Sequence, residues 1–454
     1  DLAGFAMWLN KSLQAVGAGK EVNVLIQADF DTSDKRLNDW TKDFENNPAN
    51  LTKGVTRIVL NERSRDINFD TSFTRIADKN TDIHERISEG AKYKNRMDNP
   101  ETFGKFLDWG FKNYPADQYG LMLFDHGGSW YGFGGDYQDG LGGSRNMLVK
   151  EFRREILKSF ETNAISKFNF INFYACLMGA TEVLDGFDGL CEVFYGNPEV
   201  AMVSMANNES RVKFIDYIIK NPDVDNLSLV NYEVENWMPS QWYKQTKFES
   251  KVGSHVAYDM SNYNSFLAAF NNFCDILIKE AKNKNPYLAA ARRNATPYMV
   301  KSAAEIKKPT DFIDLPHFAQ ILSKNSTGDL KTLSSNLLKA IDALIIDKFV
   351  GSMRPEISGL SLYYPIKGLS KGYIFQYDKT YFATGKTVDM PSWDDVPYFT
   401  NAYGHGRKWR HYLNEVSILA GNNDKPINYV LDGDTLVPSR SADFGIAESG
   451  IITA

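Results

Sequence analysis

Two side chains in the sequence, His126 and Cys176, are of the types that can carry out acyl transfer together. The thiol of Cys176 becomes a nucleophile when it loses its proton. An imidazole beside it, such as that of His126, can accept this proton and later return it to a leaving group. If the fold brings the two side chains together, the pair predicts attack on a carbonyl carbon and an acyl-enzyme.

Each of these residues also has a plainer interpretation. A cysteine at the end of a buried strand commonly serves as a small packing residue, and a histidine in a glycine-rich loop is commonly a surface residue. The pair together favours chemistry, because about 50 positions separate the two residues, close to the His–Cys spacing in caspases. Periodicity alone leaves the choice between packing and catalysis open.

The glycines that follow the histidine leave the backbone accessible. The N–H of Gly127 and the N–H of Cys176 are therefore candidate donors to an oxyanion that develops during acyl transfer. Asp125 precedes the histidine, but neighbouring side chains at a strand end point in opposite directions. We give Asp125 no catalytic role.

Metal and cofactor signatures are weak. The two acids Asp136 and Asp139 lie in a glycine-rich loop and are candidate calcium ligands, although a calcium site needs six or more oxygens. No Walker loop and no GxGxxG after a strand is present, and the remaining histidines lack an HExxH or CxxC companion. These are His84, His255, His317, His405 and His411. We expect no required cofactor, with calcium as the alternative.

The elements that must position the pair are apolar runs separated by helical patterns such as 101–114. Such alternation predicts βαβ units, an α/β class and an open, mostly parallel sheet flanked by helices. Functional residues gather at the carboxyl ends of such strands, and His126 and Cys176 follow the last two runs. The runs are 21–30, 55–61, 120–124 and 168–173.

The second half of the chain changes character from about residue 254. Apolar residues at three and four spacing predict long helices there, and a late apolar run predicts one strand. The helices are 262–284, 314–323 and 329–349, and the strand is 357–364. We predict a catalytic unit over 1–250, a mainly helical region over 251–420 and a weakly structured tail over 421–454.

Composition excludes several classes of function. The net charge of −6 and the pI near 5.7 argue against nucleic acid as a partner. No apolar run approaches the roughly 18 residues that cross a bilayer. The three cysteines, at 176, 191 and 274, are too few for a disulfide framework, so at least one thiol is free. The chain opens without Met, so we expect a removed signal segment, and we expect a monomer.

The sequence around the histidine and the cysteine resembles the clostripain family of clan CD cysteine peptidases, over roughly residues 20–415. The similarity begins with a strand that ends in Ala-Asp, at 26–29, and with the segment that leads into the His-Gly strand, at 115–120. It continues with an Ala-Cys-Leu-Met signature at 175–178 and Glu-Val at 182–183. Two downstream stretches, 312–319 and 359–365, also match.

That resemblance implies a caspase-like α/β fold with a mainly helical C-terminal region, and a catalytic dyad of His126 and Cys176. It implies a bacterial protein, secreted or on the cell surface, that cleaves peptide bonds in peptide or protein substrates. The thiolate would attack the scissile carbonyl, the histidine would protonate the leaving amine, and water would hydrolyse the acyl-enzyme.

The substrate-binding stretches depart from the family's pattern. Members that cut after Arg or Lys usually carry Asp two residues before the cysteine, where this chain has Tyr174, followed by Ala175. The usual second acidic stretch reads differently here, with Ser204, Asn207 and Glu209, of which Glu209 is the candidate substitute. A guanidinium in a pocket needs a carboxylate partner, so the P1 preference is expected to differ from Arg or Lys.

Two questions remain open, the role of Tyr174 and the function of the chain. Tyr174 is either a wall of the pocket or a core aromatic without substrate contact. The chain itself is either an endopeptidase or a catalytically weak relative that serves as a binding or scaffold protein. A small-molecule thiol hydrolase or transferase ranks last, because no cofactor signature accompanies the pair.

Members of the family are activated by internal cleavage after a basic residue between the two catalytic strands. The loop 132–150 is glycine-rich and contains Arg145 and Lys150 as candidate cleavage sites. A pocket that rejects basic residues would make self-cleavage there poor, so the two expectations oppose each other.

Overall fold

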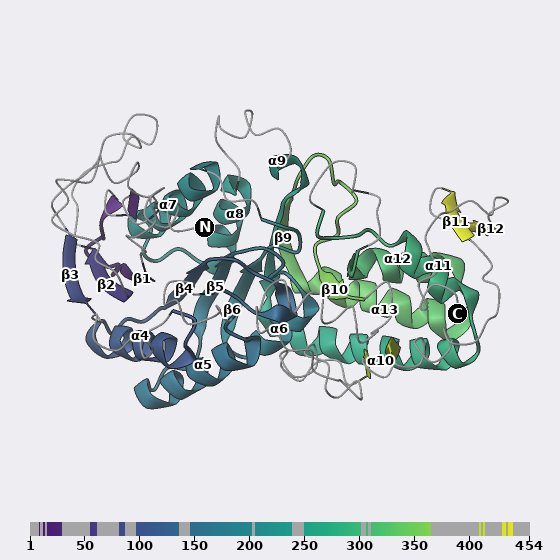
Figure 1. Ribbon diagram of the computed structural model, residues 1–454, viewed down its shortest axis with the longest axis horizontal. Helices are drawn as coiled ribbons and strands as arrows, with labels where there is room; N and C mark the ends of the chain where they lie inside the picture. The colour runs from purple at the N-terminus through teal and green to yellow at the C-terminus, as the bar shows by residue number, and fades with distance from the viewer. Residues whose placement is uncertain are drawn as a thin grey trace, which may run out of the picture.

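The fold of the chain is seen in a computed structural model (Figure 1). It describes residues 9, 12–13, 16–29, 55–60, 81–86, 97–135, 146–201, 205–237, 249–300, 306, 310–364, 408–409, 412–413, 429–432 and 435–438.

A five-stranded mixed sheet forms the centre of the molecule, in the order β4-β5-β6-β7-β9. The first three strands are parallel, and β7 and β9 continue the sheet in antiparallel orientation. The strands are β4 (Gly120–Phe124), β5 (Phe168–Tyr174), β6 (Cys191–Gly196), β7 (Ser254–Asp259) and β9 (Ile345–Val350). With helices on both faces, this confirms the predicted α/β class with a caspase-like sheet.

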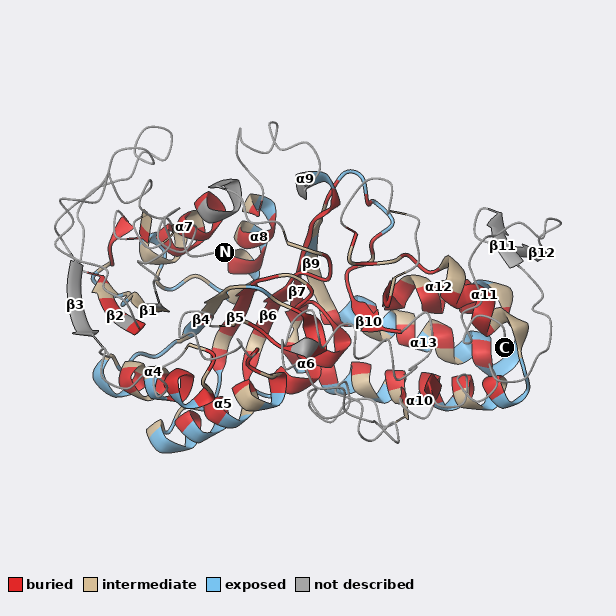
Figure 2. Cartoon of the chain, in the orientation of Figure 1, coloured by how far each residue is buried: buried red, intermediate tan, exposed pale blue. Residues whose placement is uncertain are grey.

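Helices cover the sheet on two sides (Figures 1 and 2). One face packs against α4 (Pro100–Asn113), α5 (Val149–Asn163), α6 (Thr181–Phe187) and α10 (Tyr263–Lys282), and the other against α7 (Met205–Lys220) and α8 (Asn226–Asn236). Alternation along β5 explains this, because Phe173 enters the first core while Phe170 enters the second.

The second half of the chain adds a helical layer beside the sheet. It contains α11 (Pro286–Asn294), α12 (Leu315–Asn325) and α13 (Gly328–Leu344), next to a small pair of β8 (Phe312–Asp314) and β10 (Ser361–Tyr363). Asp314 begins α12, since its carboxylate accepts the N–H of His317 at 2.8 Å. Shorter elements are 3-10 helices at Ser129–Tyr131 and Met260–Asn262, and α9 (Glu249–Val252).

Two predicted members of the parallel sheet lie elsewhere. β1 (Leu25–Asp29) and β2 (Val55–Leu60) are strands, as expected, but they pair antiparallel in a separate sheet with β3 (Thr81–Arg86). Ile58 and Leu60 pack against Val212 of α7, rather than in the central core. An apolar run predicts a buried strand, but it does not specify the partner strand, and this is why the expectation was wrong.

The predicted helix 329–349 is also wrong at its C-terminal end. Helix α13 stops at Leu344, and the chain continues as β9, where Ile345, Ile346 and Val350 favour an extended backbone. The sequence did not predict strands β6 and β7.

The central sheet takes two of its strands, β7 and β9, from beyond residue 250. The predicted division of the chain at 250/251 stays a prediction. Within the expected tail, β11 (Tyr429–Asp432) and β12 (Thr435–Pro438) form an antiparallel pair.

Candidate active site

The parallel pairing of β4 and β5 aligns the two candidate catalytic residues. Phe124 pairs with Tyr174 at the ends of the two strands. His126 and Cys176 each follow two residues later, and neighbouring strands lie about 4.8 Å apart. The register therefore brings both residues to corresponding positions at the carboxyl edge of the sheet.

Gly127 is in direct contact with the cysteine backbone. A Cβ atom on Gly127 would lie 2.2 Å from the carbonyl oxygen of Cys176 and 2.9 Å from the Cβ of Ala175. Both contacts are closer than atoms can approach, so only glycine fits here. The loop that carries His126 can reach the cysteine because its next residue has no side chain.

The turn after the cysteine is strained and held by the segment that follows β6. Leu177 has φ of 59°, in the left-handed region that costs a non-glycine residue about 1 kcal/mol. Its N–H donates to the carbonyl of Glu199 at 3.2 Å, and the N–H of Gly179 donates to the carbonyl of Asn197 at 3.0 Å. The Asn197 side chain donates to the carbonyl of Ala175 at 2.8 Å. These bonds fix the backbone on both sides of residue 176.

The thiol of Cys176 is half-buried and donates a hydrogen bond to the backbone carbonyl of Ala201 at 3.2 Å. Burial raises the pKa of this thiol, and the charge of Glu199 adds to the rise. The side chain of His126 is exposed, yet packing around its ring still lowers its pKa. Both shifts in pKa favour the uncharged forms, a thiol at Cys176 and a neutral imidazole at His126.

Tyr174 points into a buried polar cluster under the cysteine. It is 2 % exposed, and its hydroxyl donates to Glu233 Oε1 at 2.8 Å. Asn172 Nδ2 donates to the same oxygen, also at 2.8 Å. The guanidinium carbon of Arg211, on α7, lies 4.6 Å from the centre of the Tyr174 ring and 4.5 Å from that of Phe124. A carboxylate is present beneath position 174, but it belongs to α8 and is bonded within the protein.

His255 completes this cluster from β7. Its Nδ1 lies 2.9 Å from Asn197 Oδ1 and its Nε2 lies 3.2 Å from Glu233 Oε1. Its ring stacks on that of Trp237, with centroids 3.6 Å apart. Burial lowers the pKa of His255. The cluster thus connects Asn197, which bonds the backbone beside the cysteine, to helix α8.

Sequence reasoning missed Arg211, Glu233 and His255. One signal was available, because Glu233 lies next to Val230 and Val234 on the buried stripe of α8, and an acid on such a stripe needs a partner. His255 has no acidic or aromatic neighbour in the sequence at a spacing that would indicate this cluster.

The other predicted site residues are scattered. Ala175 is buried directly before the cysteine. Glu209 lies on α7, where its carboxylate pairs with Lys213 at 2.6 Å. Ser204, Arg145, Asp136 and Asp139 lie outside the described residues, as does the side chain of Asn207. Lys150 is exposed, but it lies in the first turn of α5 rather than in a loop.

The described part of the chain contains no cluster of three His, Cys, Asp or Glu side chains that could hold a metal ion. None of its helices is long and apolar enough to cross a membrane.

Comparison with known proteins agrees with this architecture. Clostripain from Hathewaya histolytica is 22 % identical over an aligned length of 374 residues, and the match covers 70 % of this chain and 66 % of clostripain. The match thus spans slightly less than two thirds of that relative's length.

Two solved structures share the fold. One is an inactive zymogen of a C11 protease from Parabacteroides distasonis, with TM-score 0.52, 16 % identity and coverage of 89 % of this chain and 95 % of that one. The other is a secreted C11 cysteine protease from Bacteroides thetaiotaomicron with an irreversible peptide inhibitor, with TM-score 0.52, 14 % identity and coverage of 88 % and 94 %. A sequence model of the clostripain family matches residues 25–409. The chain therefore belongs to the clostripain family of cysteine peptidases.

Proposed function

We propose that the chain is a cysteine endopeptidase in which Cys176 is the nucleophile and His126 the general acid and base. The observation that carries the proposal is the pairing of Phe124 with Tyr174, which places the two residues at corresponding strand ends. Membership of the clostripain family supports the same reaction class.

The reaction would run in two steps through an acyl-enzyme. His126 takes the thiol proton while Cys176 Sγ bonds to the scissile carbonyl carbon, and the oxyanion accepts hydrogen bonds from the N–H groups of Gly127 and Cys176. The C–N bond then breaks, and His126 gives its proton to the leaving amine. Water, deprotonated by His126, hydrolyses the thioester and regenerates the thiol.

A peptide carrying an electrophilic carbon in place of the scissile bond tests this assignment. We expect covalent labelling at Cys176 alone, because Cys191 and Cys274 are buried and burial raises the pKa of both. His126→Ala should slow labelling by about 100-fold or more, as loss of a general base does. Labelling of the other cysteines at equal rates, or no effect of the histidine variant, would refute the dyad.

We also propose that P1 preference has moved away from Arg and Lys. The position of the usual aspartate is Tyr174, and the nearby carboxylate of Glu233 already accepts hydrogen bonds from Tyr174 and Asn172. The guanidinium of Arg211 lies against the Tyr174 ring. A basic P1 side chain that entered a pocket at Tyr174 would therefore lie close to the positive charge of Arg211.

Profiling of wild type and Tyr174→Asp with peptides that differ only at P1 tests this proposal. We expect wild type to disfavour Arg and Lys, and the variant to shift towards them. A wild type that prefers Arg at P1 would overturn the proposal. An unchanged P1 preference in a folded Tyr174→Asp variant would show that Tyr174 does not line the pocket. Ala175, Ser204, Asn207 and Glu209 stay candidates for the remaining contacts.

A binding or scaffold role is the second candidate. The neutral resting forms of Cys176 and His126 favour it, since a thiol bonded to a carbonyl is a poor nucleophile. Retention of both residues favours the enzyme, and a weak relative would show labelling of Cys176 without peptide turnover.

Self-processing at Arg145 or Lys150 is the alternative that applies if the pocket still accepts a basic P1 residue. The bond after Lys150 lies in the first turn of a helix, so Arg145 is the better candidate. Because the proposed pocket disfavours a basic P1 residue, incubation followed by intact mass measurement should leave the wild-type chain whole. A cut after Arg145 in wild type that is absent in Arg145→Gln would establish self-processing and would contradict the proposed P1 preference.

We further propose a secreted or cell-surface monomer that needs no cofactor. The secreted protease from Bacteroides thetaiotaomicron supports export of a related chain. Light scattering should give the mass of one chain, and activity should survive EDTA. Activity that returns only with calcium would instead favour ligands such as Asp136 and Asp139.

A further inference from the structure

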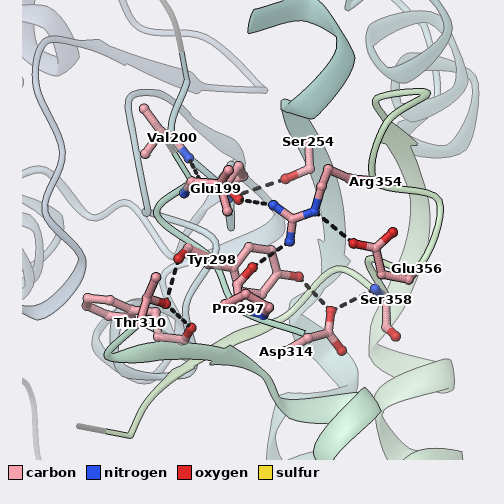
Figure 3. Close-up of polar contacts among 12 residues, drawn as sticks. Glu199, Val200, Ser254, Pro297, Tyr298, Thr310, Asp314, Arg354, Glu356 and Ser358 are labelled. Atoms are coloured by element: carbon pink, nitrogen blue, oxygen red, sulfur yellow. Dashed lines mark hydrogen bonds and ion pairs between the residues drawn. The ribbon is translucent and has the colours of Figure 1, made fainter. Parts of the chain in front are cut away.

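A buried ion pair lies behind the segment that holds the cysteine loop. Arg354 Nη1 lies 2.8 Å from Glu199 Oε2, and both side chains are 0 % exposed (Figure 3). Buried charges survive only with close partners, so each of these residues depends on the other.

Every polar atom of the Glu199 carboxylate is engaged. Oε1 accepts the N–H of Val200 at 2.8 Å and the N–H of Val300 at 3.0 Å, while Oε2 faces Arg354. The guanidinium also donates to the carbonyl of Pro297 and to Glu356 (Figure 3). The carboxylate therefore joins three segments that are distant in sequence.

The same short segment touches Cys176 from two directions. The carbonyl of Glu199 accepts the N–H of the strained Leu177, and the carbonyl of Ala201 accepts the thiol itself. A shift of the 199–201 backbone would move the turn after the nucleophile and the acceptor of its proton together. A displacement of about 1 Å at such a site can cost about 100-fold in rate.

We propose that Glu199 is a positioning residue for Cys176, with Arg354 as its counter-ion, and that its carboxylate sets the reactivity of the thiol. This inference rests on the proposed function only in taking Cys176 as the nucleophile. It gives the ion pair a role beyond holding the fold together.

Electrostatics supports a coupling between the two groups. The charge of Glu199 raises the pKa of Cys176, after the larger effect of burial. Burial raises the pKa of Glu199 itself to about 7, opposed by Arg354 and by the two backbone donors. The ionisable groups around it are Arg354, Tyr298 and Cys176. Neutralising Glu199 should therefore make the thiolate easier to form.

The test measures alkylation of Cys176 by iodoacetamide against pH, by peptide mass spectrometry, in wild type and Glu199→Gln. The amide keeps an oxygen for the Val200 and Val300 donors but removes the charge. We expect the pH of half-maximal rate to fall by about half a unit or more, as expected when a like charge nearby is removed. An unchanged midpoint in a folded variant would overturn the proposal.

Two further variants separate electrostatics from simple damage. Glu199→Gln combined with Arg354→Met removes both charges, avoids a buried unpaired guanidinium, and should show a lowered midpoint if the single variant does not fold. Asp314→Asn is the matched control, because it neutralises another buried carboxylate, which caps α12 and bonds Tyr298. It should lower the melting temperature and leave the alkylation midpoint in place, and an equal shift in this control would contradict the proposal.

Alkylation needs no peptide substrate, so failure of the two proposals can be distinguished. A lowered midpoint in a chain that cleaves no peptide would support the role of Glu199 and refute the endopeptidase.

Discussion

The thiol of Cys176 and the backbone carbonyl of Ala201 are joined by a hydrogen bond of 3.2 Å. A thiol that donates to a carbonyl is protonated, so this contact belongs to the resting state of the site. In the proposed reaction, attack on a substrate requires that this hydrogen bond break and that the proton pass to His126 instead.

The resting thiol should therefore react slowly at neutral pH. Burial raises the pKa of Cys176 above its usual value near 9, so the protonated form dominates below that pH. We expect the rate of iodoacetamide alkylation in wild type to keep rising beyond pH 9. A plateau reached near pH 7 would mean that a thiolate–imidazolium pair already exists without substrate.

Gly127→Ala should lower activity strongly while the fold persists. The new Cβ would lie 2.2 Å from the Cys176 carbonyl oxygen, so the His126 loop and the cysteine loop must separate. We expect kcat/KM to fall by about 100-fold, the cost of a shift of about 1 Å.

Gly110→Ala is the matched control for that substitution. Gly110 lies within α4, where an added Cβ would meet only Leu25 Cδ1 at 3.4 Å. Alanine in a helix is favoured over glycine by about 0.5–1 kcal/mol, so this variant should keep full activity. Equal activity of the two alanine variants would contradict the close approach of Gly127 to the cysteine.

His255 should contribute to loss of stability in acid. Its pKa is lowered in the fold by burial, so the unfolded chain binds this proton more readily than the native one. Stability from the neutral ring is present above the ordinary pKa of about 6.5 and is lost as pH falls below it.

The measurement for His255 is the melting temperature of wild type and His255→Gln between pH 8 and pH 5. The variant starts lower, because it loses the stacking on Trp237, but it should lose less on acidification. The raised pKa of Glu199 has the opposite effect, because the folded chain binds its proton more readily than the unfolded chain, so this contribution to stability grows as pH falls. Both proteins contain Glu199, so its effect cancels in the comparison. Parallel curves would show that His255 takes up its proton without penalty.

Tyr174→Phe should destabilise the chain by about 1–2 kcal/mol, because Glu233 loses one of its buried donors. Urea unfolding measures the change. Tyr119→Phe serves as control, since its hydroxyl bonds the exposed N–H of Ala116, which water can satisfy. A Tyr174→Phe variant as stable as the control would mean that the buried hydroxyl bond contributes nothing.

The sequence predicted the parts of this molecule that depend on local pattern. The helix predicted over 262–284 is α10, at Tyr263–Lys282, because its apolar stripe is long and regular. The two strands that end before His126 and Cys176 were predicted for the same reason.

The sequence pattern could not predict which strands pair or which distant side chains meet. β1 and β2 carry the same apolar signal as β5, yet they pair with each other and not with the central sheet. The polar cluster under Tyr174 was missed because Glu233 and His255 come from elements about 60 and 80 residues further on, and no local spacing connects them. Arg354, a further 100 residues along, reaches Glu199 only in the folded chain.

The most direct test of the peptidase is cleavage of a diverse peptide library by wild type and by Cys176→Ala, read by mass spectrometry. We predict cleavage by wild type alone, at sites where Arg and Lys are not the preferred P1 residues, with both proteins unfolding at similar temperatures. A library left intact by wild type, or cut equally by both proteins, would contradict it.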